Sequence, residues 1–225
     1  MPQRHALRSL WSTVLMGLVT ALLPALVQAH PHGWVDLGVR VIIDEQGQVE
    51  ALHQRWRMDP FYSLVILEEL GSAQGNDSLD ARLDQLGLDI RNNLAPQHYY
   101  TEVTHAGERL ALGEVNDYTV MERDGRVEFI FLLPLAQPVA LGEEALRYQI
   151  FDPSYYIELL HEEEGDTPRA DALVVSGDHD CTTQIVPADP DPELVMQAAM
   201  LDVTDQAEPG LGRYFAETGV VKCGS

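Results

Sequence analysis

Two histidines separated by one proline, His30-Pro31-His32, are the residues of this chain best suited to chemistry. If the chain is cut after Ala29, His30 becomes the first residue. Its free amine, its imidazole and the imidazole of His32 then lie close together. Such nitrogen donors suit Ni(II), Co(II), Zn(II) and Cu(II). The amine, with an ordinary pKa near 8, must lose its proton to bind. The motif therefore predicts a divalent transition-metal site created by processing.

Pro31 limits the ways in which this N-terminus could bind a metal. One common N-terminal copper and nickel site uses the deprotonated amide of residue two, and proline has no N–H. Three nitrogens remain, and a carboxylate could complete the site. The candidate carboxylates are Asp36 and, more strongly, Asp59 and Asp152, which give the predicted ligand set His30, His32, Asp59 and Asp152.

Each of these residues also has a purely structural interpretation. Asp59-Pro60 and Asp152-Pro153 are equally typical of a helix cap or a turn. His30 and His32 are equally typical of a frayed terminus. The sequence leaves both interpretations open.

Residues 1–29 have the pattern of a secretory signal peptide. Arg4 and Arg8 precede an apolar run over residues 11–26, and Val27-Gln28-Ala29 is a plausible cleavage site. The apolar run is shorter than the roughly 20 residues that a spanning helix needs. The sequence therefore predicts an exported chain cleaved after Ala29, with residues 30–225 forming a single domain that is not inserted in the membrane.

The charge of the chain limits its partners. It has 14 basic and 36 acidic residues, and its formal net charge is −22. A field of this sign repels nucleic acid and anionic lipid headgroups and attracts cations. We therefore expect no nucleic-acid partner, and the charge alone would also serve to keep an exported protein soluble.

Cys181 and Cys223 are the two cysteines of the chain. In an exported protein they most simply form a disulfide. The alternative is a pair of thiolate metal ligands acting with His179.

Hydropathy patterns predict many short strands and few helices. Helices are expected at Asp59-Pro60, ending at Gly71, and over residues 77–93 and 192–205. The acidic segment 161–169 is expected to be a loop. The prediction is an α+β fold with mainly antiparallel, sandwich-like sheet and a two-helix layer after the first hairpin. Strands are expected over residues 34–43, 49–58, 99–104, 110–115, 118–123, 127–133, 146–151, 173–176, 181–186 and 219–223.

The chain lacks the common catalytic sequence motifs. It has no phosphate-binding loop, dinucleotide fingerprint, nucleophile elbow or helical zinc-protease motif. We therefore expect a binding protein and not an enzyme. A copper-dependent, oxidase-like enzyme is the less favoured alternative, because an N-terminal histidine chelate can support redox chemistry.

A series of short motifs runs along the chain in this order: Ala29 to Asp36, Trp56-Arg57-Met58-Asp59-Pro60-Phe61-Tyr62-Ser63, Tyr99-Tyr100-Thr101, Leu132-Leu133-Pro134-Leu135, Tyr148 to Tyr156, and the two cysteines. This series resembles the DUF1007 family of exported bacterial proteins, also described as the periplasmic component of an ABC-type transport system. The resemblance implies a periplasmic protein acting beside an inner-membrane metal permease, as a metal-binding or metal-delivery protein for Ni, Co, Zn or Cu. A transporter adaptor that binds no metal is the alternative.

Overall fold

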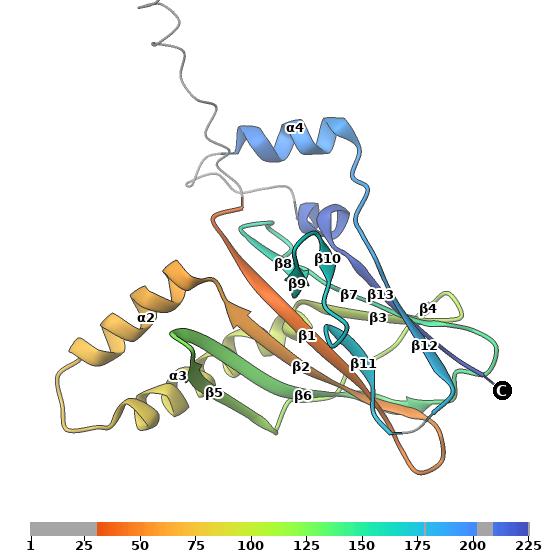
Figure 1. Ribbon diagram of the computed structural model, residues 1–225, viewed down its shortest axis with the longest axis horizontal. Helices are drawn as coiled ribbons and strands as arrows, with labels where there is room; N and C mark the ends of the chain where they lie inside the picture. The colour runs from red at the N-terminus through yellow and green to blue at the C-terminus, as the bar shows by residue number, and fades with distance from the viewer. Residues whose placement is uncertain (1–30, 178, 202–208, 225) are drawn as a thin grey trace, which may run out of the picture.

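A computed structural model describes residues 31–177, 179–201 and 209–224. The predicted leader and His30 lie outside these residues. Within them, no helix combines the length and the apolar character needed to cross a membrane. Two sheets form the body of the described chain, with helices α2 and α3 beside the first sheet (Figure 1). The predicted α+β fold with mainly antiparallel sheet is confirmed.

The first sheet is built around β1 (Gly33–Ile43). β1 pairs with β2 (Val49–Met58) in an antiparallel hairpin, as the turn signal between them predicts. β2 pairs with β6 (Arg126–Val139), and β6 pairs with β5 (Tyr118–Arg123). Alternate residues of these strands point into the core, which gives each strand one apolar side.

The other edge of β1 is shared by two short strands, and both run parallel to it. β8 (Ile157–His161) lies beside the first half of β1, and β11 (Leu173–Val175) lies beside the second half. β1 is therefore hydrogen-bonded on both sides along most of its length.

The second sheet has the order β12-β13-β7-β3-β4. Cys181 and Cys223 are register partners in β12 and β13, and they form a disulfide, so the alternative of thiolate ligands acting with His179 is wrong. Residues of both sheets contribute to one hydrophobic core. The strand bounds are β12 (Cys181–Val186), β13 (Thr218–Cys223), β7 (Leu146–Ile150), β3 (Thr101–His105) and β4 (Glu108–Arg109).

Helices α2 (Pro60–Ser72) and α3 (Leu79–Leu94) follow the first hairpin, as predicted. Asp59 caps α2 and Pro60 occupies its first turn. Gly87, in the middle of α3, lies against β5: a Cβ there would come 3.1 Å from Val120 Cγ2. The glycine thus allows close packing of helix on strand. The remaining helices are η1 (Ala95–Tyr100), α4 (Pro192–Met200) and η2 (Leu211–Phe215).

Two local predictions are wrong. Residues 110–115 do not form a strand and make only an isolated bridge, Leu112 to Leu135. The neighbouring Pro134 has no N–H, which interrupts regular pairing there. The segment 161–169 is not simply an acidic loop, because His161 ends β8 and a two-stranded hairpin, β9 (Glu163–Glu164) and β10 (Thr167–Pro168), follows.

Candidate functional site

The topology of the first sheet brings three of the predicted ligands, His32, Asp59 and Asp152, to one end of the molecule. β1 begins at this end, and β2, being antiparallel, finishes there at Met58. β8 is parallel to β1, so the turn that precedes it also lies there. Residues from the start of β1, the end of β2 and the Asp152 turn therefore become neighbours although they are far apart in sequence.

His32 lies directly before β1 and is exposed. Its backbone N–H donates to the carbonyl oxygen of Tyr156 at 2.9 Å, which continues the pairing of β1 with β8 by one residue. The His32 and Tyr156 rings are 4.5 Å apart between centroids, tilted by 42°. These two contacts fix the point at which the chain enters the sheet.

Asp59 joins β2 to α2 and is 5% exposed. Its backbone N–H donates to the carbonyl oxygen of Trp34 at 3.1 Å. One carboxylate oxygen, Oδ1, accepts from the N–H of Tyr62 at 2.9 Å and caps the helix. Within the described residues Oδ2 accepts no hydrogen bond, and a Cβ at Gly33 would lie 3.0 Å from it. Oδ2 thus faces the start of β1 with unused capacity to bind a cation.

Asp152 is bonded very differently, although it is 6% exposed and also precedes a proline. Oδ1 accepts from both the N–H and the hydroxyl of Ser154, at 2.9 and 2.8 Å. Oδ2 accepts from the N–H groups of Tyr156 and Ile157, each at 3.1 Å. Both oxygens are therefore committed to the turn that starts β8.

Asp36, the remaining carboxylate candidate, forms an ion pair through one of its oxygens. Its Oδ2 lies 2.7 Å from Nη1 of Arg126 at the start of β6. The same guanidinium donates to the carbonyl oxygens of Arg57 and Met58 at the end of β2. Arg126 therefore ties β1, β2 and β6 together at this end of the sheet.

The described residues do not by themselves form a metal centre. Over residues 31–177, 179–201 and 209–224, no three His, Cys, Asp or Glu side chains are grouped so that they could hold a metal ion. His32 and Asp59 belong to neighbouring segments, and both carboxylate oxygens of Asp152 accept hydrogen bonds within its own turn. Burial raises the pKa of the nearby Tyr100 hydroxyl, and the negative charge of Asp152 raises it further.

A buried polar link between the two sheets was not predicted from the sequence. His161 of β8 is 2% exposed. Its Nδ1 lies 2.8 Å from Glu217 Oε2, and its Nε2 lies 2.7 Å from the Tyr148 hydroxyl of β7. Burial, and then the charge of Glu217, raise the Tyr148 pKa well above 10. Each of the three groups therefore has a hydrogen-bond partner, and the link is structural.

A cluster of charged residues on the first sheet was also not predicted from the sequence. Glu128 of β6 is 1% exposed and lies opposite Arg57 of β2. Its Oε1 lies 3.7 Å from Arg55 and 3.6 Å from Arg57, and Glu162 pairs with both arginines. A Cβ at Gly38 would lie 3.0 Å from Arg55 Nη2, so glycine makes room for the guanidinium. The Arg-x-Arg spacing in β2 places both arginines on one face of the strand, and this spacing was the sequence signal that could have indicated the cluster.

Comparison with known proteins shows the family of this chain. A Haemophilus influenzae protein, described only as an uncharacterized protein, is 23% identical over 200 residues, covering 88% of this chain and 92% of that protein. No solved structure matches. The model of DUF1007, described as a protein of unknown function, matches residues 15–223. The chain therefore belongs to the DUF1007 family.

Proposed function

We propose that this chain is an exported periplasmic protein that binds a divalent transition metal and delivers it to an inner-membrane metal transporter. The ligands are the amine and ring of His30, set free by cleavage after Ala29, and the ring of His32. The Oδ2 of Asp59, which faces Gly33 and accepts no hydrogen bond from the part of the chain that the structure describes, is the observation that adds most to this proposal. Asp152 is a less suitable ligand because both of its oxygens accept hydrogen bonds, and Asp36 is less suitable because its charge is already paired with Arg126.

Two further features support the proposal. The disulfide between Cys181 and Cys223 is typical of chains that mature in an oxidising compartment, as the periplasm is. The net charge of −22 draws cations towards the whole protein. The role is binding and not catalysis, and the metal is Ni, Co, Zn or Cu.

The experiment compares two N-termini. Protein beginning at His30 is titrated with Ni(II), Co(II), Zn(II) and Cu(II) by calorimetry, beside protein that retains Ala29. The extra residue converts the amine into an amide, so we expect affinity to fall at least about tenfold for the metal that binds best. Affinity should also fall as pH drops below about 8, because the amine and imidazoles become protonated. Equal affinity in the two forms would refute the N-terminal site.

The carboxylate is tested separately. Asp59→Asn keeps a side chain that caps helices as well as aspartate but removes the charge at Oδ2. We expect weaker metal binding with unchanged thermal stability. Asp36→Asn is the matched control, because it removes the same charge from the same end of the sheet without altering Oδ2. If both variants lose affinity equally, the effect is one of general charge and Asp59 is not a ligand.

A further inference from the structure

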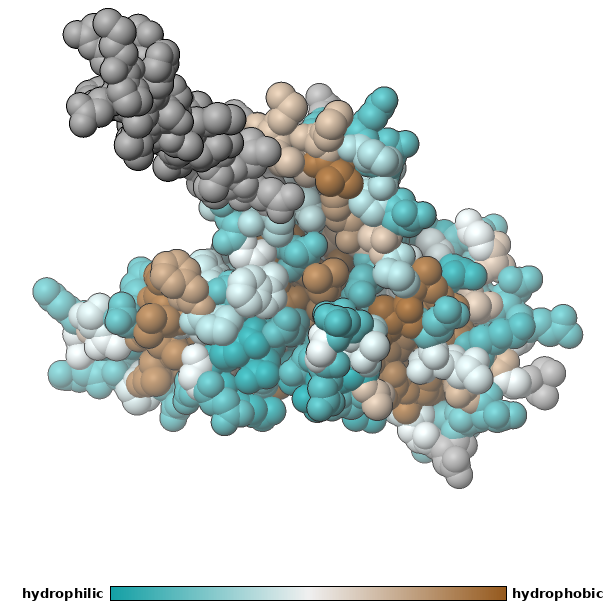
Figure 2. Space-filling model, turned by 45° about the horizontal axis from the view of Figure 1, so that its top comes forward, coloured by the Kyte–Doolittle hydropathy of each residue, from teal (hydrophilic) through white to brown (hydrophobic). Residues whose placement is uncertain are grey.

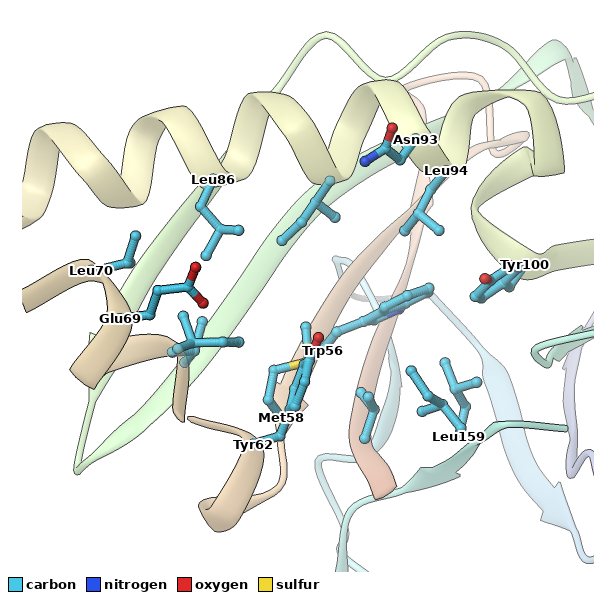
Figure 3. A pocket seen from close by; sticks show the side chains of 15 residues that line it. Trp56, Met58, Tyr62, Glu69, Leu70, Leu86, Asn93, Leu94, Tyr100 and Leu159 are labelled. Carbon is cyan, nitrogen blue, oxygen red and sulfur yellow. The ribbon is translucent and has the colours of Figure 1, made fainter. Parts of the chain in front are cut away.

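A hollow lies between the first sheet and the two helices that follow the first hairpin. α2 packs against β6, and α3 packs against β5, where Gly87 allows close approach. The helices leave a cavity of about 410 Å³ over β1, β2 and β8, and Figure 3 shows the Trp56 ring within it. Pockets that bind small molecules have volumes of roughly 300–1,000 Å³.

The floor of this cavity is rigid and apolar. Trp56 and Met58 of β2 and Leu159 of β8 are each less than 9% exposed and line it. The indole N–H of Trp56 donates to Gln54 Oε1 at 2.9 Å, and Gln54 donates in turn to Thr101 at 3.0 Å. The only polar atom of the indole is therefore satisfied by a residue outside the lining, and the ring offers a ligand an apolar surface.

Helices α2 and α3 contribute polar residues to the lining of the cavity. Glu69 of α2 and Asn93 of α3 are exposed residues that contribute to the lining (Figure 3). Among the described residues, no basic side chain pairs with Glu69. Arg82, which lies between the helices, donates to the carbonyl oxygens of Leu70 and Gly75. The cavity thus combines an apolar floor with one uncompensated negative charge, on a chain of net charge −22.

A separate apolar stripe on the outside of α2, Phe61, Leu64 and Val65, is 42–75% exposed and is not part of the lining (Figure 2).

We propose that this cavity binds a small organic cation, with its apolar body against Trp56 and its ammonium group near Glu69. The negative charge of Glu69 selects a cationic head over an anionic one. The apolar floor supplies affinity through burial of hydrocarbon, at about 25 cal/mol per Å². This site is distinct from the proposed metal site and does not depend on the processed terminus.

The test uses the neutral fluorescent probe N-phenyl-1-naphthylamine in the presence of a chelator. We expect one probe to bind per chain and to be displaced by octylammonium most readily, then octanol, then octanoate. These competitors share one hydrocarbon chain, so their order reports the head group alone. Displacement by octanoate as strong as by octylammonium would overturn the proposal.

Three variants locate the site. Ile90→Trp fills the cavity and should abolish probe binding, whereas Leu88→Trp places the same ring on the same helix at a 38% exposed position outside the lining and should leave binding unchanged. Glu69→Gln, at an exposed position, should weaken octylammonium about fivefold, the size of a surface ion pair, and leave octanol unchanged. Thermal unfolding checks that each variant is folded. Undiminished binding by folded Ile90→Trp, or an equal change for all competitors in Glu69→Gln, would refute the assignment.

Discussion

The two Asp-Pro steps of this chain look alike in sequence and are used differently in the fold. Asp59-Pro60 follows a strand and caps α2, and its carboxylate accepts one hydrogen bond among the residues that the structure describes. Asp152-Pro153 begins the turn into β8, and its carboxylate accepts four. Both are almost fully buried. Asp152 is thus saturated by its own turn, whereas Asp59 keeps one oxygen available beside the first residue of β1.

The difference shows how to separate a structural acid from a potential ligand. Burial alone does not decide, since the two residues are equally buried. The number of lone pairs already used does decide, because a carboxylate that accepts from four donors must break hydrogen bonds before it can bind a metal. Substitution of Asp152 should therefore lower stability more than metal affinity, whereas substitution of Asp59 should lower metal affinity more than stability.

The largest effect is expected at Asp152. Asp152→Ala leaves the N–H groups of Ser154, Tyr156 and Ile157 without their acceptor, and we expect a loss of about 3 kcal/mol or more in the free energy of unfolding, measured in urea. Ser154→Ala removes one hydroxyl donor and should cost only about 1 kcal/mol. A loss from Asp152→Ala no greater than from Asp59→Ala would contradict the comparison.

A smaller effect is expected at Asp59. Asp59→Ala removes the cap of α2 and should lower the free energy of unfolding by about 1 kcal/mol. Asp59→Asn should differ from the original protein by only a few tenths of a kcal/mol, because asparagine caps equally well. The same urea titrations measure both variants. A large loss in Asp59→Asn would mean that Oδ2 has a structural partner after all.

The smallest effect concerns Glu158, directly after the Asp152 turn. Burial raises its pKa above 4.5; the Tyr155 hydroxyl, which donates to it, lowers it, and the charge of Glu217 raises it further. Because the folded pKa is raised, this contribution to stability is fully present below pH 4.5 and is lost as pH rises through the folded pKa. The Glu158→Gln variant should therefore become slightly more stable relative to the original protein as the pH rises from about 4 to 7, as measured by thermal unfolding. Parallel pH profiles for the two proteins would contradict this expectation.

Local signals in the sequence predicted much of the fold. Asp124-Gly125 marks the hairpin between β5 and β6, and Asp59-Pro60 marks the start of α2. In these cases the residues that determine the conformation are adjacent in the chain. The Cys181–Cys223 pairing was predictable because the chain has two cysteines.

The sequence could not predict contacts that depend on distant partners. β8 and β11 are too short for their pattern to indicate that both pair with β1 in parallel. His161 precedes the acidic run Glu162-Glu163-Glu164, which suggested solvent exposure, yet it is buried against Tyr148 and Glu217. The different roles of Asp59 and Asp152 likewise could not be predicted, because both aspartates precede a proline. Only the hydrogen bonds that each carboxylate accepts distinguish them.

The hydrogen bond from His32 to Tyr156 has one more consequence. It holds the chain at residue 32, so a terminus at His30 would be a tether of two residues. Its amine could then lie no more than about 7 Å along the chain from His32. If the chain is cleaved and binds a metal there, as we propose, the position of cleavage would determine how far the amine reaches, because each residue added or removed would move it by about 3.5 Å.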